Sequence, residues 1–111
     1  MPDTARAFDV ETIGSVLRVS VRKEFDFGVL AQDWAHALTV TCNAAYTEVR
    51  FDLSRCGLVS STFFAGLVQI HQHYTAQGVE RVVLEKPDPR LVKNLKVLRL
   101  DSLFIIEPRA V

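Results

Sequence analysis

The chain has 111 residues, 49% of them hydrophobic, and its 13 basic residues balance 13 acidic ones. This length suits one domain with its own core, and the composition excludes a disordered chain. Zero net charge excludes an overall field that would attract nucleic acid or an anionic membrane. The apolar runs are too short to span a bilayer, and residues 1–10 lack the apolar core of a signal peptide. We therefore expect a cytoplasmic protein without a membrane span.

The first half of the chain predicts two strands and a helix between them. Residues 1–11 are polar and aperiodic and predict a flexible N-terminal arm, which leaves room for one further strand. Alternation predicts strands over 15–21 and 49–53, each with one wet side, so that Asp52 faces solvent. A turn at 24–28 precedes a helix over 29–41, whose apolar stripe comprises Leu30, Trp34, Ala37 and Leu38.

The second half predicts two more helices and two more strands. An apolar run at Leu58 meets three hydroxyl residues, and a helix follows to about Gln77, with Gly78 as its stop. A continuous apolar run predicts a buried strand over 81–85. Asp88 can cap a third helix with Pro89 in its first position. A last short strand is expected over 103–106, before a tail at 108–111.

This alternation of strands and helices predicts an α/β fold with right-handed crossovers. The wet sides of the first two predicted strands indicate that part of one sheet face is poorly covered. Cys42 and Cys56 are not spaced like metal ligands or a redox pair, so we expect two small buried hydrophobic residues. His71 and His73 are two apart on a helix and point away from each other, which argues against a shared metal ion.

The hydroxyl residues Ser60, Ser61 and Thr62 stand where a strand passes into a helix. Such side chains can cap the free backbone N–H groups of a helix start. One of them can also carry a phosphate, because a helix N-terminus favours an anion. The residues alone leave both roles open.

Several short pieces, taken in order, resemble the STAS domain of bacterial anti-sigma factor antagonists (anti-anti-sigma factors). These pieces are Asp52-Leu53-Ser54, Leu58-Val59-Ser60-Ser61-Thr62, Gly78, Val82-Val83-Leu84, Pro87-Asp88-Pro89, Leu95 and Leu100-Asp101-Ser102-Leu103-Phe104. In addition, Glu24-Phe25-Asp26 is similar to the Glu-Leu-Asp turn of the family. The resemblance implies a STAS-like single domain over 12–107. It further implies a mixed central sheet of four to five strands, with alternating helices packed mainly on one face.

The resemblance also implies a function. In the family, a serine kinase that is also an anti-sigma factor phosphorylates the strand-to-helix corner, and a phosphatase resets it. Ser61 falls on the phosphoacceptor and Thr62 on the next hydroxyl, while Asp26 falls near the partner surface. Two positions depart from the family pattern of Asp-Ser-Ser/Thr-Gly-Leu: Ser60 replaces the Asp, and Phe63 replaces the Gly.

Phe63 is either part of the core or part of a binding surface. Phe64, Leu67 and Tyr74 already form an inner face on the predicted helix, so we expect a partly exposed Phe63 that touches a partner. The partner-binding prediction thus comprises Asp26, Ser60, Ser61, Thr62 and Phe63.

These features favour a non-catalytic regulatory binding module in transcription control. The alternative is a STAS scaffold that is not phosphorylated, in a stressosome-like or lipid-transport assembly. No nucleophile elbow, phosphate-binding glycine loop or metal cluster occurs, which disfavours an enzyme or ligand carrier and predicts no cofactor, metal or catalytic residue. The third helix is basic, which indicates either a solvated face or an acidic partner; its cations are Lys86, Arg90, Lys93, Lys96 and Arg99.

Overall fold

The computed structural model describes residues 8–21, 34–42, 44–56 and 61–107, and for Ser61 and Thr62 only the backbone. The elements in chain order are β1 (Phe8–Ile13), β2 (Val16–Val21), α1 (Trp34–Thr41), β3 (Glu48–Asp52), α2 (Ser61–Ala76), β4 (Arg81–Glu85), α3 (Pro89–Val97), a 3-10 turn η3 (Asp101–Leu103) and β5 (Ile105–Glu107). The predicted α/β class with a mixed sheet is confirmed.

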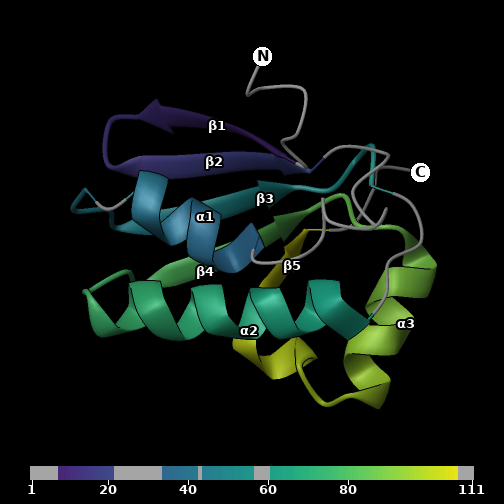
Figure 1. The fold of residues 1–111 in the computed structure, drawn as a ribbon. Coiled ribbons are helices and arrows are strands. Elements are labelled where there is room, and N and C mark those ends of the chain that lie inside the picture. The colour runs from purple at the N-terminus through teal and green to yellow at the C-terminus, as the bar shows by residue number, and fades with distance from the viewer. Residues whose placement is uncertain (1–7, 22–33, 43, 57–60, 108–111) are drawn as a thin grey trace.

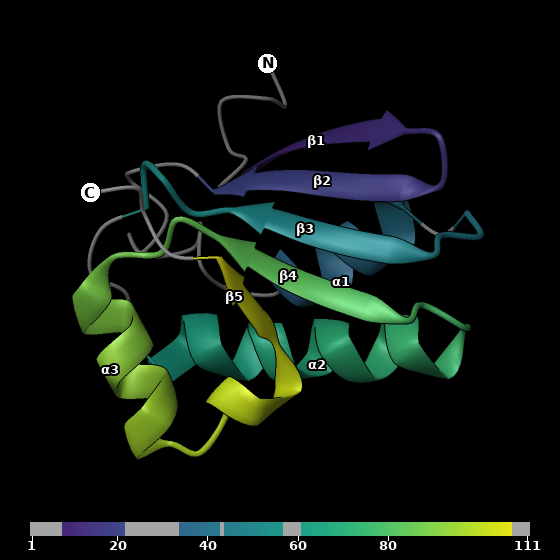
Figure 2. The same ribbon diagram turned by 180° about the vertical axis from the view of Figure 1, so that it is seen from behind.

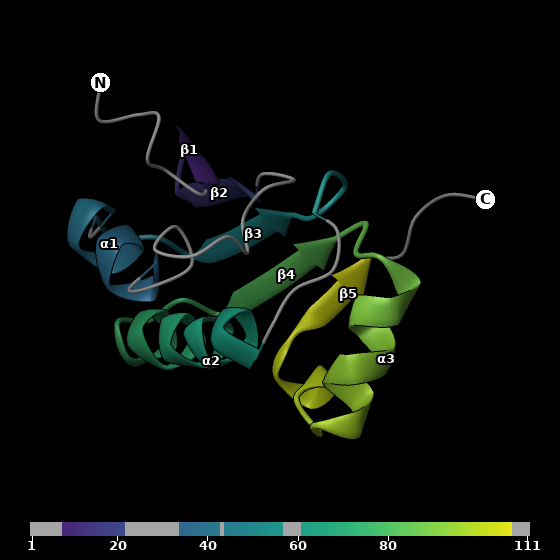
Figure 3. The ribbon, with the colours of Figure 1, turned by 45° about the vertical axis from the view of Figure 1, so that its right-hand side comes forward.

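The five strands form one sheet in the order β1-β2-β3-β4-β5 (Figure 1). β1 pairs antiparallel with β2, and the remaining neighbours pair in parallel. Right-handed crossovers that run in the same direction along a sheet place their helices on the same face. α1 and α2 accordingly lie on one face of the sheet, as Figures 1 and 2 show from opposite sides. Figure 3 shows α3 beside β5, at the edge farthest from β1.

The two faces of the sheet differ in polarity, and the predicted alternation is confirmed. Toward α1 and α2 the strands place Leu17, Val19, Val49, Phe51 and Leu84, all fully buried. The opposite face carries mostly charged residues, since successive side chains of a strand point to opposite sides. We call this second side the open face.

The predicted helix signals at α2 and α3 are also confirmed. Asp88 accepts a hydrogen bond from the Arg90 N–H at 2.8 Å, and Pro89 occupies the first turn of α3. Gly78 follows α2 with φ of +101°, a conformation that glycine adopts without strain.

The structure differs from the sequence predictions at three places. Residues 8–11 belong to β1, so the predicted flexible arm is wrong for them, and the further strand allowed there is present. Leu103 lies in η3, so the last strand begins two residues later than predicted. Ala37 of α1 is exposed, while Trp34 and Leu38 are buried as expected. The predicted turn at 24–28 and the tail at 108–111 lie outside the described residues, as do residues 29–33 of the first predicted helix.

Candidate functional site

The candidate site is the first turn of α2. α2 begins at Ser61, at the end of the sheet toward which β3 and β4 point (Figures 1 and 2). The backbones of Ser61 and Thr62 are helical, and their side chains lie outside the described part of the chain. Asp26 and Ser60 also lie outside it. The structure thus fixes where the predicted phosphoacceptors stand in the fold.

A helix start has free backbone N–H groups and the positive end of the helix dipole. The first turn of α2 contains no acidic residue that would already neutralise this end. An anion attached there would be stabilised by both effects, because the N–H groups donate hydrogen bonds and the dipole attracts negative charge. The turn is therefore chemically suited to a phosphate.

Phe63 lies in the core, so the predicted partly exposed Phe63 is wrong. Its side chain has 0% exposure and stacks on Trp34 of α1 with 5.3 Å between ring centroids and 1° between ring planes. The physical reason is that α2 packs against both the sheet and α1, so its buried stripe is wider than a single inner face. A fully buried ring cannot contact a partner.

Gly66 completes the contact between the two helices. A Cβ atom built on Gly66 would stand 2.0 Å from Nε1 of Trp34, so the indole lies directly against the α2 backbone. Trp34 also meets Phe51 of β3 edge to face, with ring centroids 6.1 Å apart. The start of α2 is thereby held to α1 and the sheet by Trp34, Phe63 and Gly66.

The far end of α2 is anchored as well. Tyr74 is fully buried, and its hydroxyl donates to the carbonyl of Cys42 just after α1. Burial raises the pKa of Tyr74 well above its ordinary value, so the phenol stays neutral. Cys42 and Cys56 are both buried and form no disulfide, in line with the prediction of two small buried residues. α2 is fixed near both ends, and its first turn is presented on a rigid support.

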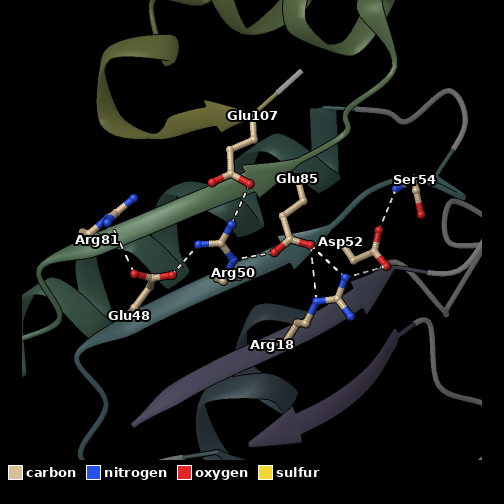
Figure 4. A network of polar contacts seen from close by, with 8 residues as sticks. All are labelled: Arg18, Glu48, Arg50, Asp52, Ser54, Arg81, Glu85 and Glu107. Atoms are coloured by element: carbon tan, nitrogen blue, oxygen red, sulfur yellow. Dashed lines mark hydrogen bonds and ion pairs between the residues drawn. The ribbon is translucent and has the colours of Figure 1, made fainter. Parts of the chain in front are cut away.

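The open face carries a network of arginines and carboxylates (Figure 4). Arg50 of β3 donates to Glu48, Glu85 and Glu107, the last at 2.6 Å. Arg18 of β2 donates to Glu85 at 2.9 Å and to Asp52 at 3.3 Å. Glu85 thus accepts from both arginines. These ion pairs join β2, β3, β4 and β5 across the side without helices.

The network shifts the pKa of its members. Burial raises the pKa of Glu85, but hydrogen bonds from Arg50 and Arg18 outweigh it and leave the pKa below its ordinary value. The pKa of Asp52 is likewise lowered, because hydrogen bonds from Ser54 and the charge of Arg18 exceed the effect of burial. Hydrogen bonds to Glu85 and two other carboxylates raise the pKa of Arg50. All these groups are charged at neutral pH.

Asp52 links this network to the connection that leads to α2. One carboxylate oxygen accepts from Arg18, and the other accepts from the Ser54 backbone N–H at 3.0 Å. The predicted placement of Asp52 on the polar side of its strand is confirmed by its contact with Arg18. Sequence analysis missed the network itself; the signal was the acidic or basic residue at every second position of β3 and at the ends of β4.

A metal or cofactor site is not evident in the described residues. They contain no group of three or more His, Cys, Asp or Glu side chains able to hold a metal ion. His71 contacts Phe104, whereas His73 contacts Tyr74 and lines a shallow hollow with Ala35, His36, Thr39 and Gln69. The two histidines therefore have different surroundings, as their spacing predicts. Within this part of the chain, every helix is too short or too polar to cross a membrane.

The topology and the presented helix start define a two-layer α/β domain with helices on one side of a mixed sheet. A family model described as the STAS domain matches residues 7–110, and the chain belongs to the STAS domain family. No curated protein sequence is a significant match.

Solved structures show the same fold. The crystal structure of a candidate anti-sigma factor antagonist from Thermotoga maritima, TM1081, has 18% identity and a TM-score of 0.79, over 92% of this chain and 86% of that one. The structure of the anti-sigma factor antagonist SpoIIAA in its unphosphorylated form has 14% identity and a TM-score of 0.72, over 94% of this chain and 90% of that one.

Proposed function

We propose that this protein is a non-catalytic regulatory binding module of the bacterial cytoplasm that acts like an anti-sigma factor antagonist. It binds a serine kinase that is also an anti-sigma factor, and phosphorylation of Ser61 at the start of α2 ends the binding. A phosphatase restores the binding form. The observation that carries the proposal is the position of Ser61 as the first residue of α2, at the carboxyl end of the parallel strands.

The packing beneath the turn supports this role. A phosphoacceptor that a kinase must reach needs a fixed position, because binding to a preordered segment costs less entropy. Phe63 and Gly66 pack against Trp34 and hold the first turn of α2 in place. The backbone of Ser61 and Thr62 is therefore ordered before a partner binds. Phe63 replaces the family glycine, but its ring points into the core and leaves the approach to Ser61 unobstructed by that side chain.

Phosphorylation would act mainly on the partner. A phosphate adds roughly two negative charges at a helix end that accepts them well, so its effect on the fold is small. The same charges at the contact with an apposed protein cost desolvation and repel acidic groups. The expected result is a folded protein that no longer binds.

The test is phosphate transfer from radiolabelled ATP by the cognate serine kinase. We expect label on the wild type, loss of label in Ser61→Ala, and retention in the matched variant Ser60→Ala. Thr62→Ala distinguishes the second candidate hydroxyl: loss of label in that variant alone would move the acceptor to Thr62. An unlabelled wild type with an active kinase would refute the switch.

A second candidate is a STAS scaffold that is not phosphorylated. The observation that favours it is Ser60, which replaces the family aspartate beside the acceptor and supplies weaker orientation of a neighbouring hydroxyl. For a scaffold, the kinase leaves the protein unlabelled, and Ser61→Asp leaves its assembly state unchanged in light scattering after size exclusion.

A further inference from the structure

The open face carries an excess of negative charge. Among the described residues, the strand pairings place six carboxylates and three guanidinium groups on this side of the sheet, so carboxylates outnumber guanidinium groups there. The carboxylates are Asp9, Glu11, Glu48, Asp52, Glu85 and Glu107, and the guanidinium groups are Arg18, Arg50 and Arg81. The chain as a whole has zero net charge, so the remaining residues together carry an excess of positive charge.

No helix among the described elements covers the open face, as Figure 2 shows from that side. Glu107 is 45% exposed in the network, and apolar side chains are exposed at both margins of the sheet: Ile13 on β1 is 56% exposed and Ile105 on β5 is 41% exposed. A face that combines surplus charge with exposed aliphatic groups can bind another molecule, because it offers both attraction and apolar area.

The positive charge lies on α3. Residues 88–99 contain four cations and one carboxylate, an excess of three positive charges, and the carboxylate of Asp88 pairs with Arg90 at 3.0 Å. Lys93, Lys96 and Arg99 are exposed and make no ion pair within the described residues. Val97, one turn after Lys93 on the same side of the helix, is 73% exposed. This surface, the α3 surface, is complementary to the open face in the sign of its charge.

One molecule cannot bring the two surfaces together. α3 lies at the β5 edge (Figure 3). It packs Leu91 and Leu95 into the core, and its cations lie on the exposed side of the helix. A second copy has no such restriction. Its α3 would add a helix to the side of the sheet that lacks one, with the lysines near the carboxylates and Val97 near an exposed isoleucine.

From this complementarity we infer that the protein self-associates, with the α3 surface of one copy on the open face of another. The contact is distinct from the start of α2 and does not depend on phosphorylation. Its strength is largely electrostatic, so it is salt-sensitive, because exposed charges are screened beyond about 10 Å at 0.1 M salt. Reciprocal docking yields a closed dimer, and one-way docking yields a chain of copies.

Sedimentation equilibrium of a charge-swap pair tests the inference. We expect the wild type to associate at low salt and to dissociate on addition of sodium chloride. The variant Lys93→Glu/Lys96→Glu has an acidic α3 surface, and Glu11→Lys/Glu107→Lys has a basic open face. Each alone should associate on the order of tenfold more weakly or not at all, and their mixture should recover association, because opposite signs then meet again.

A matched variant changes charge elsewhere on the surface: Glu80→Lys before β4, at an exposed residue. We expect it to associate like the wild type. If the reversed pairs fold poorly by circular dichroism, the neutral variants Lys93→Gln/Lys96→Gln and Glu11→Gln/Glu107→Gln replace them. A wild type that stays monomeric at low salt and high concentration overturns the inference and assigns these surfaces to other molecules. Association that is indifferent to the swap also overturns it, whatever the outcome of the kinase test.

Discussion

At the residue scale, Phe63 shows how a substitution at a functional corner can serve the core. The family pattern has glycine at this position, and the phenylalanine found here stacks on Trp34 with full burial. Gly66, three residues later, gives the indole room to lie against the helix backbone. Phe63 and Gly66 both pack against Trp34, so the effect of a substitution at one position depends on the residue at the other.

We predict that Gly66→Ala destabilises the protein by about 1–3 kcal/mol, although alanine is the better helix former, because overpacking forces a rigid ring to move. The new Cβ atom would stand 2.0 Å from Nε1 of Trp34, far inside van der Waals contact. Urea denaturation measures the change in the free energy of unfolding. Ala65→Ser, at the exposed neighbouring position, is the control and should change it by less than about 0.5 kcal/mol. An unchanged or raised stability in Gly66→Ala would show that Trp34 does not pack as described.

At the element scale, the sequence predicted most of the fold through local signals. The period of two in β2 and β3, and the Asp88-Pro89 start of α3, report local geometry that side chains of that kind prefer. The prediction of an arm over 1–11 overlooked a short alternation of Phe8 and Val10 with Asp9 and Glu11, which is only four residues long. Pairing with β2 turns Phe8 and Val10 toward the inner side of the sheet. The prediction of an exposed Phe63 was wrong because the ring packs on α1, and the spacing of apolar residues along α2 alone carries no information about a contact with another helix.

The start of α2 yields a prediction that separates stability from binding. Ser61→Asp should raise the free energy of unfolding by about 0.5–1 kcal/mol, because the first turn has no other acidic residue to interact with the helix dipole. The same variant should lose binding to the kinase if phosphorylation is the switch. Thermal denaturation and titration of the kinase measure the two effects, with Ser61→Asn as the uncharged control. Loss of stability together with binding would mean that the variant disturbs the fold rather than the contact.

At the scale of the whole molecule, the domain is a two-layer structure whose second sheet face is covered by ion pairs instead of helices. Arg50 and Arg18 pair with carboxylates from three strands, β3, β4 and β5, across this face. Val83 of β4 faces the same side and is nevertheless fully buried. The network therefore shields part of the sheet from water.

The network predicts how stability depends on pH. Because the pKa values of Glu85 and Asp52 are lower in the folded protein than in the unfolded chain, the unfolded chain binds more protons in acid. The free energy of unfolding should be highest above the ordinary carboxyl pKa of about 4 and should decline as the pH falls toward the folded-state pKa values.

Glu85→Gln should lower the free energy of unfolding by about 1–2 kcal/mol at neutral pH, because it removes the carboxylate to which both arginines donate. The arginine side chains are 21% and 37% exposed, so water partly replaces the lost contacts. The variant should also show a weaker decline of stability in acid. Urea denaturation across the acid range measures both effects. The exposed Glu80→Gln should follow the wild type, and a Glu85→Gln protein with the slope of the wild type would show that the ion pairs contribute nothing to the acid sensitivity of the fold.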